Sequence, residues 1–152
     1  MKWKTKLILN GLKIVSMKIE HMLFIDNLSY LPMSLRKLPE AFRISVTISW
    51  YPHNFNKNKN LNYVGPIPEV SYFVVDEMSI SERREFMTCH DDQKNKVFDN
   101  KLVLQKYFQD DVRNFRQACQ IFIREFMEIG NIEVFLESFT IASAFIKTIF
   151  ET

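Results

Sequence analysis

Glycine and proline are scarce in this chain of 152 residues, with 3 and 5 copies. That scarcity, with 47% hydrophobic residues, excludes a disordered or low-complexity protein. The two cysteines and three histidines are scattered, so no spacing typical of a zinc site is present. We interpret Cys119 as a small buried hydrophobe and expect an intracellular, reducing environment.

Long uncharged apolar runs are also missing. No stretch approaches the ~18 residues of a membrane span, so we expect no membrane partner. The formal net charge is only +2, which permits a nucleic-acid partner without requiring one. The length of 152 residues corresponds to about one domain, and the 14 phenylalanines can supply its hydrophobic core.

The first third of the chain predicts short strands and one short helix. β-Branched residues indicate a strand over 13–19, and a turn at Glu20-His21-Met22 leads to a second strand over 23–26. Ser34 is a candidate cap for a helix from Leu35 towards Phe42. Alternation over 44–50 predicts a further strand. Proline and asparagine then predict loops up to Pro68.

The remainder predicts three main helices. Ser79-Ile-Ser-Glu82 is a capping-box pattern that opens a helix through about Gln93. A second helix begins near Asn100, a good N-cap, and ends at Gly130. Its expected apolar stripe consists of Leu104, Phe108, Val112, Phe115, Cys119, Phe122 and Phe126. A third helix over 132–150 is apolar nearly all round, so it should be packed on something, and its uncapped end suggests that the polypeptide continues.

Tyr107 and Asp111 stand out within the second helix. Residues four apart lie one above the other on a helix face, so this phenol and this carboxylate are neighbours. Such a pair can position a metal ion and the water that the metal activates. Asp110, on the adjacent position, is expected to be solvated. A tyrosine and an aspartate four residues apart occur by chance in many helices. The neighbouring sequence motifs therefore determine whether this pair indicates a functional site.

Several longer segments carry a family resemblance. They are the run from Leu23 to Pro39, Asn10-Gly-Leu-Lys-Ile14, Tyr51-Pro-His-Asn-Phe-Asn56, Tyr63-Val-Gly-Pro-Ile-Pro68, and the run from Val97 to Glu137. In this order they resemble the exonuclease domain of protein-primed family B DNA polymerases of viral, organellar and linear-plasmid origin, and the likeness to the type found in Polinton (Maverick) transposons is close. The resemblance covers nearly the whole chain.

The resemblance implies an α/β (α+β) fold. It would be part of an RNase H-like 3′–5′ exonuclease domain, with an N-terminal β-hairpin and three main helices. Residues 1–130 would be the partial exonuclease domain, and 131–152 a helix leading towards a polymerase (palm) domain. In the family, carboxylates hold two Mg²⁺ ions about 4 Å apart. By match to the family's third motif, Tyr107 would position the attacking water and Asp111 would be a metal ligand.

The family also has an element that grips single-stranded DNA. The matching positions are Asn27, Leu28 and Tyr30, with Asn27 in place of a hydroxyl residue. Tyr30 would either stack on a base or be a half-buried tyrosine at a strand end. Lys57 and Lys59 lie in a loop that either contacts phosphates or is simply solvated.

Two parts of the family pattern are missing from this sequence. Asp-x-Glu occurs nowhere, and Asn95-x-x-x-Asp99 falls between helices, where we expect loop and cap chemistry. One carboxylate cannot hold two Mg²⁺ ions, which prefer several oxygen ligands. The chain is therefore expected to be catalytically inactive by itself, although the family that it resembles performs DNA replication as DNA-directed DNA polymerases (nucleotidyltransferases).

Three functional hypotheses remain open at this point. The chain is a piece of a DNA polymerase with DNA- and nucleotide-binding ancestry, acting on single-stranded DNA or primer-template. Alternatively, it is a non-enzymatic remnant of a mobile element that binds DNA, the missing polymerase domain or another protein. The third hypothesis is a degraded reading frame without function.

Overall fold

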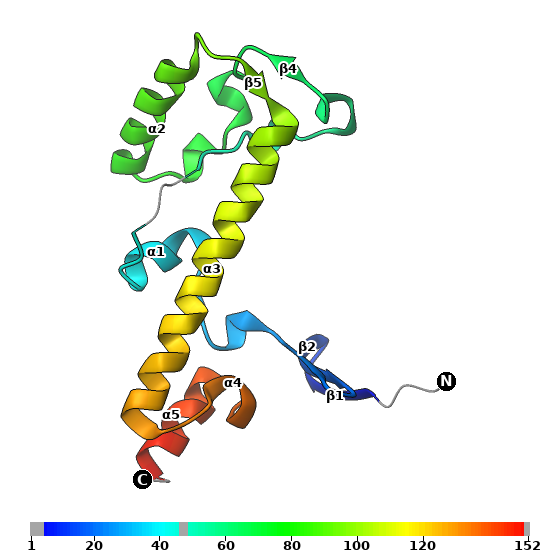
Figure 1. Cartoon of the computed structure of the whole chain (residues 1–152), viewed down its shortest axis with the longest axis vertical. Coiled ribbons are helices and arrows are strands. Elements are labelled where there is room, and N and C mark those ends of the chain that lie inside the picture. The colour runs from blue at the N-terminus through cyan, green and yellow to red at the C-terminus, as the bar shows by residue number, and fades with distance from the viewer. Residues whose placement is uncertain (1–4, 46–48, 151–152) are drawn as a thin grey trace. The chain divides into compact units, whose positions relative to one another are not determined.

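The computed structural model describes residues 5–45 and 49–150. Figure 1 shows strands at the N-terminal end, one long helix and several shorter helices. By its contacts the chain divides into two compact units. The first consists of residues 1–45 and 114–152, and the second of residues 46–113. This division does not test the predicted domain boundary at residue 130, which stays a prediction.

The N-terminal sheet contains the two predicted strands and one more. Strands β1 (Thr5–Asn10), β2 (Lys13–Ile19) and β3 (Met22–Ile25) pair antiparallel in the order β1-β2-β3. The predicted strands at 13–19 and 23–26 are thus confirmed, whereas β1 was not predicted. Gly11 adopts φ 61° between β1 and β2, a left-handed conformation that glycine takes without strain.

One face of this sheet is apolar and open to solvent. Leu7 is paired with Met17, and Met17 with Phe24, so the three side chains form one row across the strands. Leu7 and Phe24 are each 48% exposed. An apolar sheet surface of this kind is unusual for a complete globular domain.

The short helix predicted over 35–42 is confirmed in outline. A 3-10 turn spans Leu35–Lys37 and α1 spans Leu38–Ala41. Leu38 is fully buried in the core of the first unit. The other buried members of that core are Tyr30, Leu31, Ala118, Phe122, Phe126, Val134 and Ala144.

Helix α3 spans Asn100–Gly130 and confirms the predicted second helix. The predicted stripe holds only in part. Phe122 and Phe126 are buried in the core, but Phe108 and Val112 are 56% and 65% exposed. The two halves of α3 belong to different units: residues up to 113 pack within the second unit and those from 114 within the first, so a single stripe does not serve both. The first half of α3 turns the Tyr107 face inward instead.

The predicted helix over 132–150 is broken into two. Helix α4 spans Val134–Glu137 and α5 spans Ile141–Phe150. Thr140 causes the break, because its hydroxyl accepts a hydrogen bond from the Ser143 backbone N–H at 3.1 Å and so caps a new helix. The Ser143 hydroxyl in turn accepts from the backbone N–H groups of Phe139 and Thr140.

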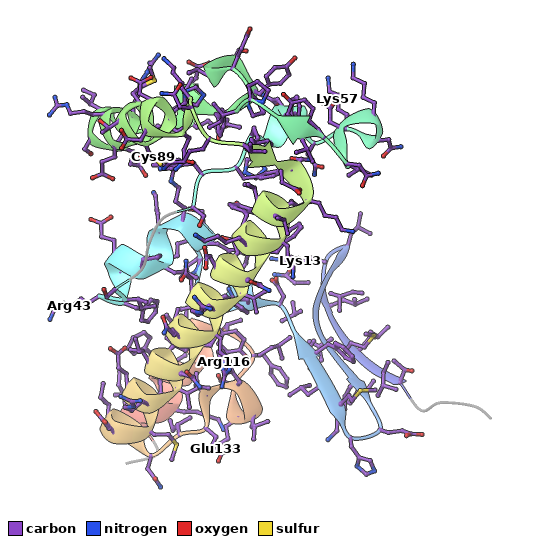
Figure 2. All side chains as sticks on the ribbon, turned by 45° about the horizontal axis from the view of Figure 1, so that its top comes forward. Lys13, Arg43, Lys57, Cys89, Arg116 and Glu133 are labelled. Atoms are coloured by element: carbon purple, nitrogen blue, oxygen red, sulfur yellow. The ribbon has the colours of Figure 1, made fainter. Side chains whose placement is uncertain are left out.

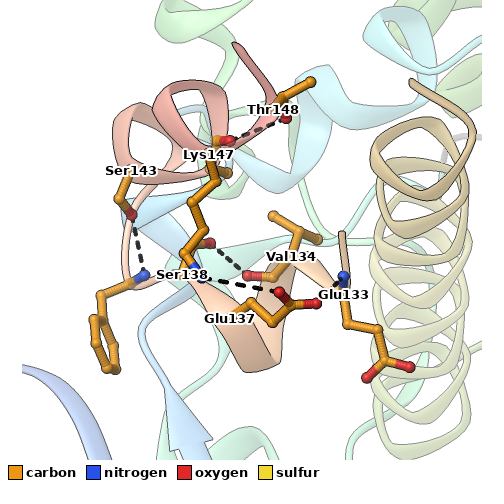
Figure 3. A network of polar contacts seen from close by, with 9 residues as sticks. Glu133, Val134, Glu137, Ser138, Ser143, Lys147 and Thr148 are labelled. Carbon is orange, nitrogen blue, oxygen red and sulfur yellow. Dashed lines mark hydrogen bonds and ion pairs between the residues drawn. The ribbon is translucent and has the colours of Figure 1, made fainter. Parts of the chain in front are cut away.

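Polar contacts hold the segment around this break (Figure 3). The Ser138 hydroxyl donates to the Val134 carbonyl, and Glu137 accepts from the Glu133 backbone N–H at 2.8 Å. Lys147 lies 3.8 Å from the Glu137 carboxylate. Helix α5 packs on the core of the first unit through Ala144, which is fully buried, as expected, while Ile149 at its outer side is 67% exposed.

The second unit is built from loops, one helix and the start of α3. Helix α2 spans Ile80–Gln93 and begins with the predicted capping box. The Ser79 hydroxyl accepts from the Glu82 N–H at 3.3 Å, and the Glu82 carboxylate accepts from the Ser79 N–H at 2.7 Å. Strand β4 (Val64–Gly65) pairs antiparallel with β5 (Phe98–Asp99).

The combination of helices with small antiparallel sheets is compatible with the expected α/β (α+β) class. The strand predicted over 44–50 is absent at residues 44, 45, 49 and 50, and its centre, 46–48, lies outside the described residues. No helix in the described ranges is long and apolar enough to cross a membrane.

Candidate functional site

The candidate site lies on the first half of α3, within the second unit. Tyr107 and Asp111 occupy one face of the helix as predicted, and a hydrogen bond from Tyr107 reaches the Asp111 carboxylate. Both side chains are partly buried rather than open to solvent. The pair predicted from its spacing is therefore formed in the structure.

Two rings from the loop after Trp50 pack on Tyr107. The Tyr51 ring is stacked on it, with centroids 5.5 Å apart and planes 29° from parallel. The His53 ring meets Tyr107 edge-on at 5.3 Å and Tyr51 edge-on at 5.4 Å. Three mutually packed rings fix the position of the Tyr107 hydroxyl beside Asp111.

Asn100 attaches this loop to the start of α3. It is fully buried, and its Oδ1 accepts from the Tyr51 hydroxyl at 3.1 Å while its Nδ2 donates to the Asn60 carbonyl at 2.9 Å. Asn100 therefore links the Tyr51 and Asn60 segments to α3 and is not the helix cap that we predicted. The cap is Asp99, whose Oδ1 accepts from the Leu102 N–H at 3.1 Å, which confirms the expected cap chemistry of the Asn95–Asp99 segment.

Asp110 differs from its expected solvated state. Its side chain is only 13% exposed, one oxygen accepts from the Ser49 hydroxyl, and the other lies 3.5 Å from the Arg113 guanidinium. The expectation failed because Ser49 is 61 positions away in sequence. Both oxygens of Asp110 are thus already occupied by groups of the chain itself.

Burial raises the pKa of Asp111 above its ordinary value. Partial removal from water disfavours the charged carboxylate and is the largest cause, to which repulsion from Asp110 adds. The hydrogen bond from Tyr107 and the attraction of His53 act in the opposite direction. A carboxyl whose ionisation is opposed in this way is suited to proton exchange or to binding a cation.

The predicted DNA-gripping positions belong to the first unit. Asn27 opens a 3-10 turn, and Leu28 is 54% exposed. Tyr30 is 1% exposed, and its hydroxyl donates to the Ser138 carbonyl at 2.7 Å. Its ring packs edge-on against Phe135 at 4.9 Å. Tyr30 is thus more fully buried than the half-buried alternative, and this placement gives no support to stacking on a base.

The donor set does not fit the pair of Mg²⁺ ions expected from the resemblance. Among the described residues, no group of three or more histidine, cysteine, aspartate or glutamate side chains converges. Asp111 is bonded by Tyr107, whereas the neighbouring carboxylate of Asp110 is held by Ser49 and Arg113. Two-metal sites require several oxygen ligands, so the side chains around Tyr107 support no catalytic step through such a pair.

Comparison with known families establishes the lineage of the chain. The model of the family described as "DNA polymerase type B, organellar and viral" matches residues 1–151, so the chain belongs to this family. The resemblance to type B DNA polymerases noted from its motifs is thereby confirmed.

Two relatives are similar to parts of the chain. A protein of Neurospora intermedia named "Probable DNA polymerase" is 32% identical over 110 residues, which are 69% of this chain and 11% of that protein. A protein of Podospora anserina with the same name is 34% identical over 59 residues, 39% of this chain and 5% of the relative. The chain therefore spans about a tenth or less of these relatives. No solved structure matches it.

Sequence reasoning missed part of the site. Tyr51 and His53 entered the sequence analysis only through a matching motif and its loop, Asn100 entered it only as a predicted helix cap, and Ser49 was assigned no role. The signal available was the Tyr51-Pro-His53 motif itself, because two rings flanking a proline are well placed to pack on a third. Nothing local to Ser49 indicates that it pairs with a helix far along the chain.

Proposed function

We propose that this chain is a piece of a type B DNA-directed DNA polymerase, derived from its 3′–5′ exonuclease region, and that it has no nuclease activity alone. The observation that carries the proposal is the hydrogen-bonded Tyr107–Asp111 pair on α3, beside an Asp110 carboxylate that Ser49 and Arg113 already hold. The family membership supports the ancestry. The missing ligand set among the described residues supports the inactivity.

Each side chain of the pair has a physical role in this proposal. Asp111 supplies a partly buried carboxylate as the remnant ligand. Tyr107 holds that carboxylate, and His53 adds a ring edge and an attractive charge. Single-stranded DNA or a primer-template is the proposed partner of the parent enzyme, with Asn27 and Leu28 as proposed contacts.

A nuclease assay tests the proposed inactivity. The full chain is incubated with single-stranded DNA labelled at its 3′ end, in Mg²⁺ or in Mn²⁺, beside its Asp111→Ala and Asp110→Asn variants. We expect no nucleotide release beyond the Asp111→Ala background. Release that is lost in Asp111→Ala and kept in Asp110→Asn would refute the proposal. Equal release by all three proteins identifies a contaminating nuclease and leaves the inactive chain supported.

A second candidate is DNA binding without catalysis, favoured by the exposed lysines Lys57 and Lys59 on the loop after His53 (Figure 2 labels Lys57). Phosphate contacts make affinity fall with salt, by about 0.7 in the slope of log K against log salt per contact on single strands. Replacing both lysines by alanine should lower that slope by roughly 1.4. An absence of binding at low salt would eliminate this candidate.

A further inference from the structure

A cavity of about 370 Å³ lies within the second unit, lined by residues of α2, of the segment after it and of the first turns of α3. Part of its lining is closed to any partner, because Phe73 and Phe86 are 4% and 1% exposed and pack on each other at 4.8 Å. The lining that a partner can reach is also apolar. Trp50 and Val103 are half-buried, and Val97 is 77% exposed.

Two polar side chains of the lining are committed to the chain itself. The Ser49 hydroxyl donates to Asp110, and His90 Nε2 lies 2.9 Å from the Pro68 carbonyl oxygen. The other ring nitrogen of His90, Nδ1, is itself buried. Sites for small polar molecules place a few polar groups precisely around the ligand. The buried lining of this cavity lacks such a set among its side chains and instead suits one large apolar side chain.

Positive charge lies on the exposed part of the lining. Lys96 and Lys106 both line the cavity, both are exposed, and neither forms an ion pair with a described residue. No described residue of the lining is acidic. Complementary charges across an interface set its register and exclude wrong partners. The two lysines therefore favour a partner that carries carboxylates beside its apolar group.

The apolar and the charged features of the lining are carried by different side chains with different exposure. A peptide matches this separation, because one residue can present the apolar side chain while its neighbours present carboxylates. The half-buried amide of Gln93 also lines the cavity and holds both a donor and an acceptor, as a peptide main chain requires. These features favour a protein segment over a small molecule.

We propose that this cavity docks a protein segment in which a large apolar side chain is flanked by acidic residues. The apolar side chain packs on Trp50, Val97 and Val103. The flanking carboxylates lie at Lys96 and Lys106. The surface needs neither DNA nor a metal ion, so it goes beyond the function proposed above. A nuclease result of either sign leaves it standing, and its own failure leaves the proposed ancestry standing.

Titration of Trp50 fluorescence with a short peptide tests the surface. A Trp3→Phe background leaves Trp50 as the sole tryptophan of the sequence. The probe is the blocked peptide acetyl-Asp-Leu-Phe-Asp-Gly-amide, which has no tryptophan. We expect a saturable change that weakens with added salt, because exposed charges are screened. Two matched peptides should bind more weakly, one with lysines in place of the aspartates and one with glycines in place of Leu-Phe.

Substitutions in the full chain separate the two parts of the surface. Lys96→Ala and Lys106→Ala should each weaken binding about two- to fivefold, as expected for exposed charge pairs. Lys101→Ala, at an exposed lysine of α3 outside the lining, should leave it unchanged. Val97→Asp should weaken binding about tenfold or more, because it places a carboxylate in the apolar contact. Its matched control is Ile80→Asp, at an 83% exposed residue of α2 outside the lining, and should have no effect.

A second readout uses the exposed thiol of Cys89, which lies in the lining and is labelled on α2 in Figure 2. The bound peptide should slow alkylation of Cys89, measured by mass spectrometry of the digested chain. It should not slow alkylation of Cys119, which packs against the core of the first unit. This readout does not depend on Trp50 and requires no substitution.

Four outcomes would overturn the proposal. One is the absence of saturable peptide binding at millimolar concentrations. Another is equal binding of the peptide with glycines, which would reduce the surface to an anion patch. The third is displacement of the peptide by single-stranded oligothymidine as readily as by more peptide, because the lysines would then serve a nucleic acid. The fourth is equal binding of octanoate, which would assign the cavity to a small apolar acid.

Discussion

Replacement of Asn100 by alanine should destabilise the second unit more than any other single amide change in it. The side chain makes two hydrogen bonds, one from the Tyr51 hydroxyl and one to the Asn60 carbonyl, and it is fully buried. An unsatisfied buried polar group costs about 1–3 kcal/mol, and the Asn60 bond is only partly buried. We therefore expect a loss of about 2–4 kcal/mol in the free energy of unfolding.

Urea unfolding followed by Trp50 fluorescence in the Trp3→Phe background measures this loss in the unit that contains Asn100. Tyr51→Phe removes only one hydrogen bond and should cost about 1 kcal/mol. In the double variant the two losses should fall short of additivity by about 1 kcal/mol, because the shared hydrogen bond is counted twice. Asn62→Ala, at an exposed amide of the same loop region, is the control and should change little.

A loss of less than about 0.5 kcal/mol for Asn100→Ala would refute this reasoning, since it is the size of an ordinary surface substitution. Full additivity of Asn100→Ala and Tyr51→Phe would refute the hydrogen bond between them. Either result would also weaken the account of how the Tyr51 ring is held against Tyr107.

Three further predictions concern other parts of the chain. Tyr30→Phe should lower the free energy of unfolding by about 1–2 kcal/mol in urea, because the buried Ser138 carbonyl loses its donor; an unchanged midpoint would contradict this. Gly130→Ala should destabilise by about 1 kcal/mol, because its Cβ would lie 2.7 Å from Thr148 Cγ2, and Thr148→Ala should relieve the clash; a stabilised single variant would refute it. Burial raises the pKa of Asp111 above 3.8, so the folded state holds its proton more tightly than the unfolded state, and this contribution is lost as pH rises through the folded pKa. The stability of Asp111→Asn relative to the natural chain should therefore increase between about pH 4 and pH 7 in urea unfolding, and a constant or falling difference would contradict the sign.

The elements that the sequence predicts well are those whose signals are local. The capping box at Ser79 involves residues three apart, and α3 ends where Asn131, directly after Gly130, adopts the left-handed φ of 50°. The predicted pair Tyr107 and Asp111 succeeds for the same reason, because four residues on a helix fix their neighbourhood. In each case all the interacting residues lie within about one helical turn of one another, so the sequence alone shows them together.

The failures come from partners that are distant in sequence or from competing local bonds. Asparagine is a favoured helix N-cap, but the Asn100 side chain is hydrogen-bonded to Tyr51 and Asn60 instead. Asp99 caps the helix in its place. The helix predicted over 132–150 is apolar nearly all round, yet the Thr140 hydroxyl starts a new helix within it. The hydrophobic pattern of a sequence does not show which side chains form such hydrogen bonds with the backbone or with distant residues.

The open face of the N-terminal sheet has a practical consequence for handling the protein. The row of Leu7, Met17 and Phe24 is apolar, and β1 and β3 are each paired on one side only among the described strands. Strands with free backbone groups beside an apolar surface attract the same strands of other molecules. Concentrated samples should thus form oligomers through this sheet, and a lysine placed at Leu7 is the substitution that keeps titrations at high protein concentration interpretable.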